Sequence, residues 1–255
     1  MKKNIYHITI IMPVKDEKEN ILWTIERIEK VVVPDHEIFI IYDSDKDNSL
    51  IILNKIKNKY PCLHLIKNHY GHGVINAIRT GFNQANGNLI VMMAADRTDD
   101  PETINKMFLK IQKGYDIVCP TRYAKGGKVI GKISLKSILS RLSGISTPLF
   151  LGIPTTDLTY SYKMFTKEVI DKIHIESRGG FEFAEELLIK AHFSGFKITE
   201  VPTLWVDRTY GKSQFKLFSW LPRYIYWYLL GIFWRVRNQI IFFFKKKPAT
   251  IDISR

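Results

Sequence analysis

Cysteine is scarce in this chain, since only Cys62 and Cys119 occur among 255 residues. Both lie beside apolar, strand-like residues, and neither belongs to a cluster with the spacing of a metal site. We therefore expect two buried free thiols in a reducing compartment rather than a disulfide framework. The short apolar run near the N-terminus ends at Pro13 without a small-residue cleavage site, so we expect no secretory signal and a cytosolic location.

Internal repeats, low-complexity segments and a recognisable nucleic-acid-binding motif are also missing. Hydrophobic residues make up 45% of the chain and charged residues 25%, which is typical of a globular protein. The 38 basic residues outnumber the 25 acidic ones. This excess indicates an anionic partner: a phosphorylated substrate, a nucleic acid or an anionic membrane surface.

Acidic residues are absent from residues 208–247, which carry nine basic residues. The longest uncharged stretch of this segment, 224–234, is about half of the roughly 20 residues that span a bilayer. Crossing would also bury Arg235 and Arg237, each at a cost of roughly 2.5–3.5 kcal/mol. We therefore expect amphipathic helices in the membrane interface. A helix packed on the domain and a nucleic-acid face are the alternatives, and the dense apolar runs disfavour the second.

Apolar, β-branched runs alternate with helical patterns in the first half of the chain. The expected strands are residues 5–14, 37–42, 62–66, 89–95 and 116–120. This alternation predicts an α/β fold, with a parallel sheet between two layers of helices and a ligand pocket at the carboxyl ends of the strands.

The second half shows a less regular pattern. We expect a helix over residues 132–150, a strand-like run over 156–165, a helix that opens at 181–186 and a strand over 198–206. Pro202 within the last strand implies a sheet edge or a bulge. Lys136, Ser140 and Arg141 form a basic stripe on the first of these helices, which by its pattern alone is a solvated face.

The run Leu89–Ala95 brings Asp96 to the carboxyl end of a buried strand. Hard cations such as Mg²⁺ take oxygen ligands and bridge to substrate phosphates, so we expect Asp96 to bind a metal. Asp100 lies directly before Pro101, where we expect it to cap the following helix.

An ordered set of motifs between Ile8 and Lys216 resembles the family 2 glycosyltransferases, and within them the dolichol- or polyprenyl-phosphate mannosyl- and glucosyltransferases. The motifs are Met-Pro-Val-Lys-Asp-Glu at 12–17, the acidic loop from Asp43, Ala-Ala-Asp at 94–96, Thr-Arg-Tyr at 121–123, Thr-Asp-Leu at 156–158 and Val-Asp-Arg-Thr-Tyr-Gly-Lys-Ser at 206–213. The resemblance implies a GT-A fold, with a Rossmann-like, mostly parallel sheet. It also implies a catalytic domain at 1–216, followed by the basic aromatic tail at 217–255.

The resemblance assigns roles to particular residues. Asp96 would hold Mg²⁺ or Mn²⁺, and Asp96, Asp157, Glu186 and Arg208 are the candidate catalytic residues. The nucleotide sugar would contact Pro13, Glu17, Asp43, Ala95, Arg122 and Lys212. The acceptor phosphate would contact Arg122, Lys136, Ser140 and Arg208.

Two positions depart from the family pattern. Tyr42 stands where the loop after the second strand commonly has an acid, and Ala94 stands where the metal motif begins with Asp. The loss of a carboxylate at position 94 should weaken metal or ribose binding, and Asp99 is the candidate replacement.

The resemblance implies inverting transfer of a hexose from a GDP- or UDP-sugar to a polyprenyl phosphate, by a peripheral enzyme on the cytoplasmic face of the membrane. The leaving diphosphate must be neutralised by a cation and basic side chains. A lipid phosphate is already an anionic nucleophile, whereas a saccharide or glycolipid hydroxyl, the first alternative acceptor, needs a base such as Asp157 or Glu186. A non-catalytic nucleotide-binding scaffold is the second alternative, and we expect no nucleic-acid partner.

Overall fold

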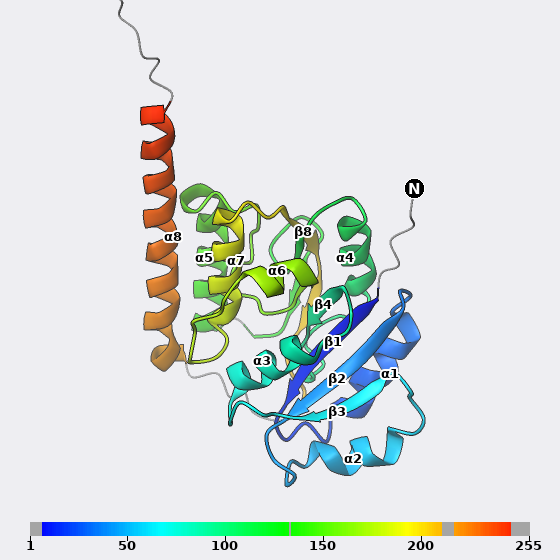
Figure 1. Cartoon of the computed structure of the whole chain (residues 1–255). Helices are drawn as coiled ribbons and strands as arrows, with labels where there is room; N and C mark the ends of the chain where they lie inside the picture. The colour runs from blue at the N-terminus through cyan, green and yellow to red at the C-terminus, as the bar shows by residue number, and fades with distance from the viewer. Residues whose placement is uncertain (1–6, 133, 211–216, 246–255) are drawn as a thin grey trace, which may run out of the picture.

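The computed structural model describes residues 7–132, 134–210 and 217–245. A seven-stranded sheet with the order β3-β2-β1-β4-β7-β5-β8 forms its centre, beside a small two-stranded sheet of β6 and β9 (Figure 1). The strands are β1 (Ile8–Val14), β2 (His36–Tyr42), β3 (Leu63–Lys67), β4 (Leu89–Met92), β5 (Ile117–Thr121), β6 (Lys128–Ile130), β7 (Lys163–Thr166), β8 (Ile198–Pro202) and β9 (Leu204–Val206). The helices are α1 (Ile21–Val31), α2 (Ser49–Ile56), α3 (Val74–Gln84), α4 (Thr103–Ile111), α5 (Leu135–Phe150), α6 (Lys167–Lys172), α7 (Phe183–Phe193) and α8 (Leu217–Lys245).

The central sheet is mostly parallel, as the alternation of apolar runs predicts. Ile8 of β1 lies opposite both His36 of β2 and Leu89 of β4 in parallel register. Only β7 runs against its neighbours among the described strands of this sheet, pairing Met164 with Val91 of β4 and Val118 of β5. The carboxyl ends of β1, β2, β4 and β5 therefore meet at one edge, where the loops that follow them can build a common site.

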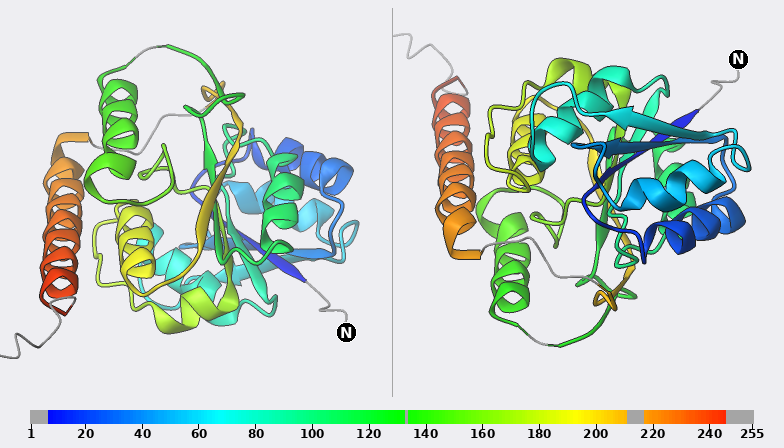
Figure 2. Two further views of the ribbon diagram at one scale, coloured as in Figure 1. Left: turned by 90° about the horizontal axis from the view of Figure 1, so that it is seen from above. Right: turned by 90° about the horizontal axis from the view of Figure 1, so that it is seen from below.

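Helices cover both faces of the sheet (Figure 2). Side chains of α1, α2 and α4 share one hydrophobic core with Ile10 and Met12 of β1, whereas α3, α6 and α7 share the other core with Ile11. Successive residues of a strand point to opposite faces, so one strand supplies both cores. This two-sided burial explains why the strands read as continuous apolar runs.

The second half of the chain differs from the predicted elements. The run 156–165 is a strand only from Lys163, and the run 198–206 divides at Thr203 into β8 and β9. Strand β8 lies at the edge of the large sheet, consistent with Pro202 in its last position. Cys119 is buried and Cys62 half-buried, and both thiols are free.

Helix α5 approaches the chain after β5 very closely. A Cβ atom at Gly144 would collide with the carbonyl oxygen of Thr156. The glycine thus allows α5 to lie against residues 156–157, which brings Ser140, one turn earlier on the helix, to the end of β5.

The described part of the tail forms one helix, α8, where the sequence suggested several. The helix lies along the side of the domain next to α5 and α7 (Figures 1 and 2). Trp227 is buried in the core that contains α7, and the ring of Trp234 packs edge-on against Phe193. A Cβ atom at Gly231 would lie 2.9 Å from Leu151, so the glycine permits this close packing. Within the described residues, no helix combines the length and the apolar character that crossing a bilayer requires.

Candidate active site

A cavity of about 1600 Å³ opens at the carboxyl edge of the sheet. Its lining begins with Pro13 and Asp43 at the ends of β1 and β2 and continues through Ala95 and Asp96 after β4. The same cavity extends between α5 and α8, where Leu142 and Leu229 form part of its wall. One continuous cavity therefore joins a polar end at the strands to an apolar end between two helices.

Asp96 lies at the centre of the polar end. Its Oδ1 atom accepts hydrogen bonds from the backbone nitrogen of Thr98 at 3.2 Å and from the Thr98 hydroxyl at 2.7 Å. Its Oδ2 atom is ion-paired with the guanidinium of Arg208, which also lies 3.5 Å from Glu17 Oε1. Burial raises the pKa of Glu17, and the hydrogen bond from Asn20 and the charge of Arg208 oppose that shift. Arg208 thus gathers two carboxylates from different loops at one point.

The turn that presents Asp96 is strained. Arg97 has a φ angle of 66°, in the left-handed region that non-glycine residues rarely occupy. Its guanidinium lies 5.4 Å from the rings of both Trp23 and Tyr210. These contacts hold the side chain of Arg97 outward while its neighbour Asp96 faces the cavity. Strain of this kind costs about 1–3 kcal/mol and is concentrated at functional sites.

Asp99 is the candidate replacement for the acid that is missing at position 94. Its carboxyl group accepts a hydrogen bond from the backbone nitrogen of Ala94 at 2.8 Å and another from the Tyr160 hydroxyl. Burial, followed by the negative charge of Asp96, raises the pKa of Asp99 to about 7. The Asp99 carboxyl group therefore contacts the backbone at the position where the family pattern has its first acid, and it lines the cavity with Asp96.

Arg122 is held by Asp157. Arg122 Nε donates to Asp157 Oδ2 at 2.7 Å and Nη2 donates to Oδ1 at 2.8 Å, while Nη2 also donates to Ser140 Oγ at 2.9 Å. Burial lowers the pKa of Arg122, but the charge of Asp157 outweighs that effect and the net shift is upward. Asp157 is fully buried and is not part of the cavity lining. Its carboxylate orients Arg122, which does line the cavity, and the expected role of Asp157 near the transferred sugar stays a prediction.

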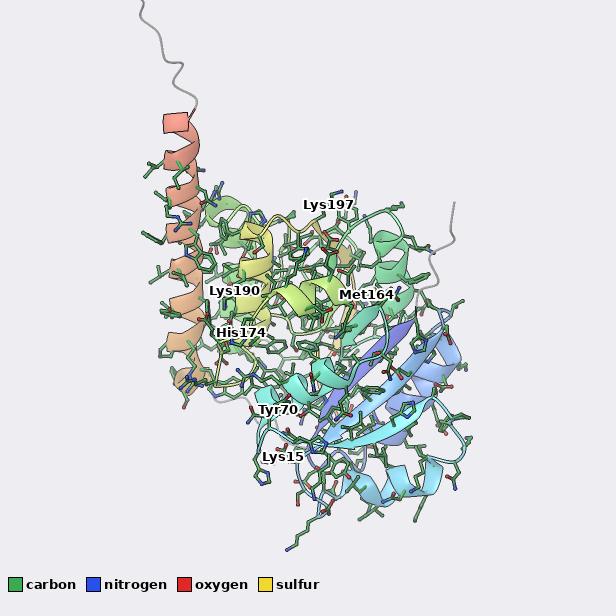
Figure 3. The ribbon with its side chains drawn as sticks, viewed as in Figure 1. Lys15, Tyr70, Met164, His174, Lys190 and Lys197 are labelled. Carbon is green, nitrogen blue, oxygen red and sulfur yellow. The ribbon has the colours of Figure 1, made fainter. Side chains whose placement is uncertain are left out.

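Glu186 also lies outside the cavity lining. Its carboxylate accepts hydrogen bonds from the backbone nitrogens of Glu176 at 2.6 Å and Ser177 at 2.8 Å, and from Lys190 Nζ at 2.6 Å. Lys190 also donates to the carbonyl of His174 at 2.8 Å, and Figure 3 shows the two residues close together. Glu186 thus fixes the segment before α7, and its expected place near the transferred sugar stays a prediction.

The neighbouring residue, Glu185, lines the cavity instead. Glu185 was not among the residues predicted from the sequence. The pair Glu185-Glu186 at the start of a helical pattern was a visible signal, but helix phase alone did not show which of the two faces the ligand.

The remaining predicted site residues fall into two groups. Those that line the cavity are Pro13, Glu17, Asp43, Ala95, Asp96, Arg122, Lys136, Ser140 and Arg208. Asp43 is fixed by the nitrogen of Gly73 at 2.8 Å and by Asn68 at 2.7 Å. Burial, followed by the positive charge of Arg122, lowers the pKa of Lys136, so these cations share one region. Lys212 lies outside the described residues.

The donor set suits a cation that binds with its substrate. Within the described residues, no group of three or more His, Cys, Asp or Glu side chains could hold a metal ion by itself. Asp96 is instead an oriented carboxylate that shares the cavity with Glu17, Asp99 and basic side chains. Mg²⁺ is commonly bound by one or two carboxylates plus substrate phosphates and water, which this arrangement fits.

Comparison with known proteins identifies the class. Residues 9–174 match the model of glycosyl transferase family 2, and the chain belongs to that family. The chain is 30% identical to the dolichol-phosphate mannosyltransferase of Pyrococcus furiosus, over 86% of this chain and 62% of that enzyme. It is 25% identical to the polyprenol monophosphomannose synthase of Mycolicibacterium smegmatis, over 80% of this chain and 79% of that protein.

A solved structure shows the same architecture. The glucosyl-3-phosphoglycerate synthase of Mycobacterium tuberculosis, crystallised with Mn²⁺, uridine diphosphate and phosphoglyceric acid, superposes with a TM-score of 0.68. The alignment covers 89% of this chain and 78% of that one at 13% sequence identity. This likeness concerns the fold, which is the GT-A fold with its mostly parallel sheet flanked by helices, as the sequence predicted.

Proposed function

We propose that this protein is an inverting glycosyltransferase that transfers a hexose from a nucleoside diphosphate sugar to a polyprenyl phosphate. The observation that carries the proposal is the single cavity that joins Asp96, Arg122, Lys136 and Arg208 to an apolar wall from α5 and α8. A nucleotide sugar fits the polar end, and a lipid that carries a phosphate fits the passage from cations to apolar side chains. The similarity to enzymes named for dolichol phosphate and polyprenol monophosphomannose supports the same acceptor class.

At the donor end, Asp96 would hold Mg²⁺ or Mn²⁺ together with the diphosphate. The metal, when bound, neutralises charge on the leaving diphosphate. Asp43, with both carboxylate oxygens fixed, is placed for the nucleoside, beside Pro13 and Glu17. Lys136 and Arg208 supply positive charge where the diphosphate and the acceptor phosphate meet, which stabilises the transition state electrostatically.

At the acceptor end, the chemistry needs no general base. An oxygen of the lipid phosphate attacks the anomeric carbon, the bond from that carbon to the diphosphate oxygen breaks, and its electron pair leaves with the nucleotide. Asp157 and Glu186, the expected bases for a hydroxyl acceptor, are occupied with Arg122 and with backbone nitrogens outside the cavity. This arrangement favours a phosphate acceptor over a hydroxyl acceptor.

The outer faces of α5 and α8 support a location at a membrane surface. Both helices expose apolar side chains at helical spacing. They are Leu135, Ile138, Leu142, Ile145 and Leu149 on α5 and Ile225, Leu229, Phe233, Val236 and Ile240 on α8. A helix that presents such a stripe beside basic residues lies in the headgroup region of an anionic bilayer. We propose that the tail 217–255 docks the catalytic domain 1–216 in this way.

The test is transfer of radiolabelled sugar from GDP-mannose and UDP-glucose into butanol-extractable polyprenyl phosphate, with Mg²⁺ or Mn²⁺ and with Asp96→Asn beside the wild type. We expect lipid-linked product that disappears with the substitution. Metal-dependent hydrolysis of the donor without lipid-linked product would favour a hydroxyl acceptor. The absence of both products would favour a non-catalytic nucleotide-binding scaffold.

A further inference from the structure

Glu185 presents an unsatisfied polar group to the cavity. The side chain is 1% exposed, and no described residue forms a hydrogen bond with its Oε2 atom. A buried polar atom without a partner costs about 1–3 kcal/mol, and native structures contain few of them. The residue also lines the cavity, so a ligand bound there can supply the missing partner.

The surroundings of Glu185 favour an uncharged partner over a phosphate. Lys136, which lines the cavity, interacts electrostatically with Arg122 and Arg208. Glu185 instead interacts with Lys163, and it affects Tyr224 and Tyr228 of α8. Lys163 is itself fully buried and donates to the backbone carbonyls of Leu158 and Tyr160. The cation that interacts with Glu185 is thus a lysine that does not line the cavity.

The carboxyl group of Glu185 also has the character of a hydroxyl-binding group. Burial raises its pKa well above the ordinary value, against the opposing charge of Lys163, and so favours the protonated form, which can both donate and accept a hydrogen bond. Phe181, four residues before Glu185, and Trp220 also line the cavity, with ring centroids 5.3 Å apart. An aromatic wall beside a neutral carboxyl group fits a sugar ring, whereas a prenyl chain would leave the carboxyl group unpaired.

We infer that Glu185 is a sugar-specificity residue whose carboxyl group hydrogen-bonds a hydroxyl of the transferred hexose. The inference rests on the proposed function, and it adds to it the place of the sugar between α7 and the start of α8. A site built to hydrogen-bond a substrate hydroxyl discriminates strongly against an analogue that lacks it.

The test uses Glu185→Met, which removes the hydrogen bond at similar volume, and Glu185→Gln, which keeps a neutral donor and acceptor. The donors are GDP-mannose and UDP-glucose, with derivatives deoxygenated at C2, C3, C4 or C6. For the wild type we expect one deoxygenated donor to lose at least 100-fold in kcat/KM. In Glu185→Met the loss in kcat/KM for the same deoxygenated donor should shrink to a few-fold, whereas Glu185→Gln should keep most of the wild-type loss. Glu182→Met is the matched control, because Glu182 on the same turn is equally buried, has an unpartnered Oε2 atom and does not line the cavity.

Calorimetric binding of GDP and UDP separates this inference from the proposed function. All variants should bind the nucleoside diphosphate as the wild type does. Two outcomes would show that Glu185 serves only to balance Lys163 and that the inference is wrong. In the first, Glu185→Met discriminates among the deoxygenated donors as the wild type does. In the second, Glu185→Gln loses as much discrimination as Glu185→Met, and its Tm falls. If wild type binds the nucleotide but forms no lipid-linked product, the proposed function fails. Binding then still tests the inference. The ratio of the affinity for the nucleotide sugar to the affinity for the nucleotide alone should fall in Glu185→Met and be largely kept in Glu185→Gln.

Discussion

The two ends of the cavity are held in different ways. At the strand end, polar side chains are fixed by specific partners, such as Asp43 by Gly73 and Asn68, and Arg122 by Asp157. At the helix end, Leu142 and Leu229 belong both to the cavity wall and to the exposed faces of α5 and α8. The first end is preorganised for a small charged ligand, whereas the second is complete only when an apolar partner covers it. This difference supports the proposal that the donor binds from water and the acceptor from the membrane.

The largest expected effect is at the preorganised end. Asp157→Ala leaves the Arg122 guanidinium buried without its bidentate partner, and breaking such a pair costs about 3–5 kcal/mol. We expect a loss of that size in the free energy of unfolding, measured by urea denaturation. The double variant Arg122→Met, Asp157→Leu should recover a large part of it, since no charge remains buried. A loss below about 1 kcal/mol for Asp157→Ala would show that this end is not held by the pair.

The next effect concerns the charges that link the two ends. Lys136→Gln removes one positive charge from the region shared with Arg122 and Arg208. A hydrogen bond to a charged group contributes about 1.5–3 kcal/mol, so the KM for polyprenyl phosphate should rise roughly 10- to 100-fold. The KM for the nucleotide sugar should change much less. Arg141→Gln, on the same helix but not in the cavity lining, is the control. An unchanged acceptor KM in both variants would remove Lys136 from the acceptor site.

The helix end is tested by Leu229→Asp, measured as cosedimentation with vesicles of anionic phospholipid. Burial of a leucine side chain contributes about 1.5–3 kcal/mol, so vesicle affinity should fall at least tenfold. Leu109→Asp on α4 is the matched control, because both leucines are 58% exposed and only Leu229 lies on the proposed membrane face. Equal losses in the two variants, or none in either, would contradict a membrane role for this face.

The fold could be predicted from the sequence more completely than the site could. The five predicted parallel strands exist because two-sided burial imposes continuous apolar runs that can be read directly. The run 156–165 misled because Tyr160 and Tyr162 are buried outside any strand, where their hydroxyls bond Asp99 and the carbonyl of Asp100. An alternating apolar pattern indicates that side chains are buried. A loop held by long-range hydrogen bonds can bury its side chains as a strand does, so the pattern alone does not identify a strand.

Which side chains line the site depends on local geometry that the sequence pattern does not fix. Glu185 and Glu186 are adjacent on a helix, about 100° apart, so a small error of phase exchanges their roles. Asp99 reaches Ala94 only because the chain turns back at Arg97. The pairing of Arg122 with Asp157 joins residues that are 35 positions apart, and no local pattern predicts it.

Asp99 provides the finest test of the strand end, because its effect on stability is expected to vary with pH. Its pKa of about 7 in the folded protein exceeds the ordinary value near 3.9 of an unfolded chain, so between these values the folded state binds a proton that the unfolded state lacks. The stability that this proton contributes is fully present below about pH 4 and is lost as the pH rises to about 7, with a slope of at most about 1.4 kcal/mol per pH unit. Asp99→Asn cannot titrate, so the difference in unfolding free energy between wild type and variant should decline with that slope across the window and level off above it. Urea denaturation in metal-free buffer at several pH values gives this difference directly. Parallel curves would show that Asp99 is already ionised at low pH, as a carboxylate that fully replaces the missing acid at position 94 would be.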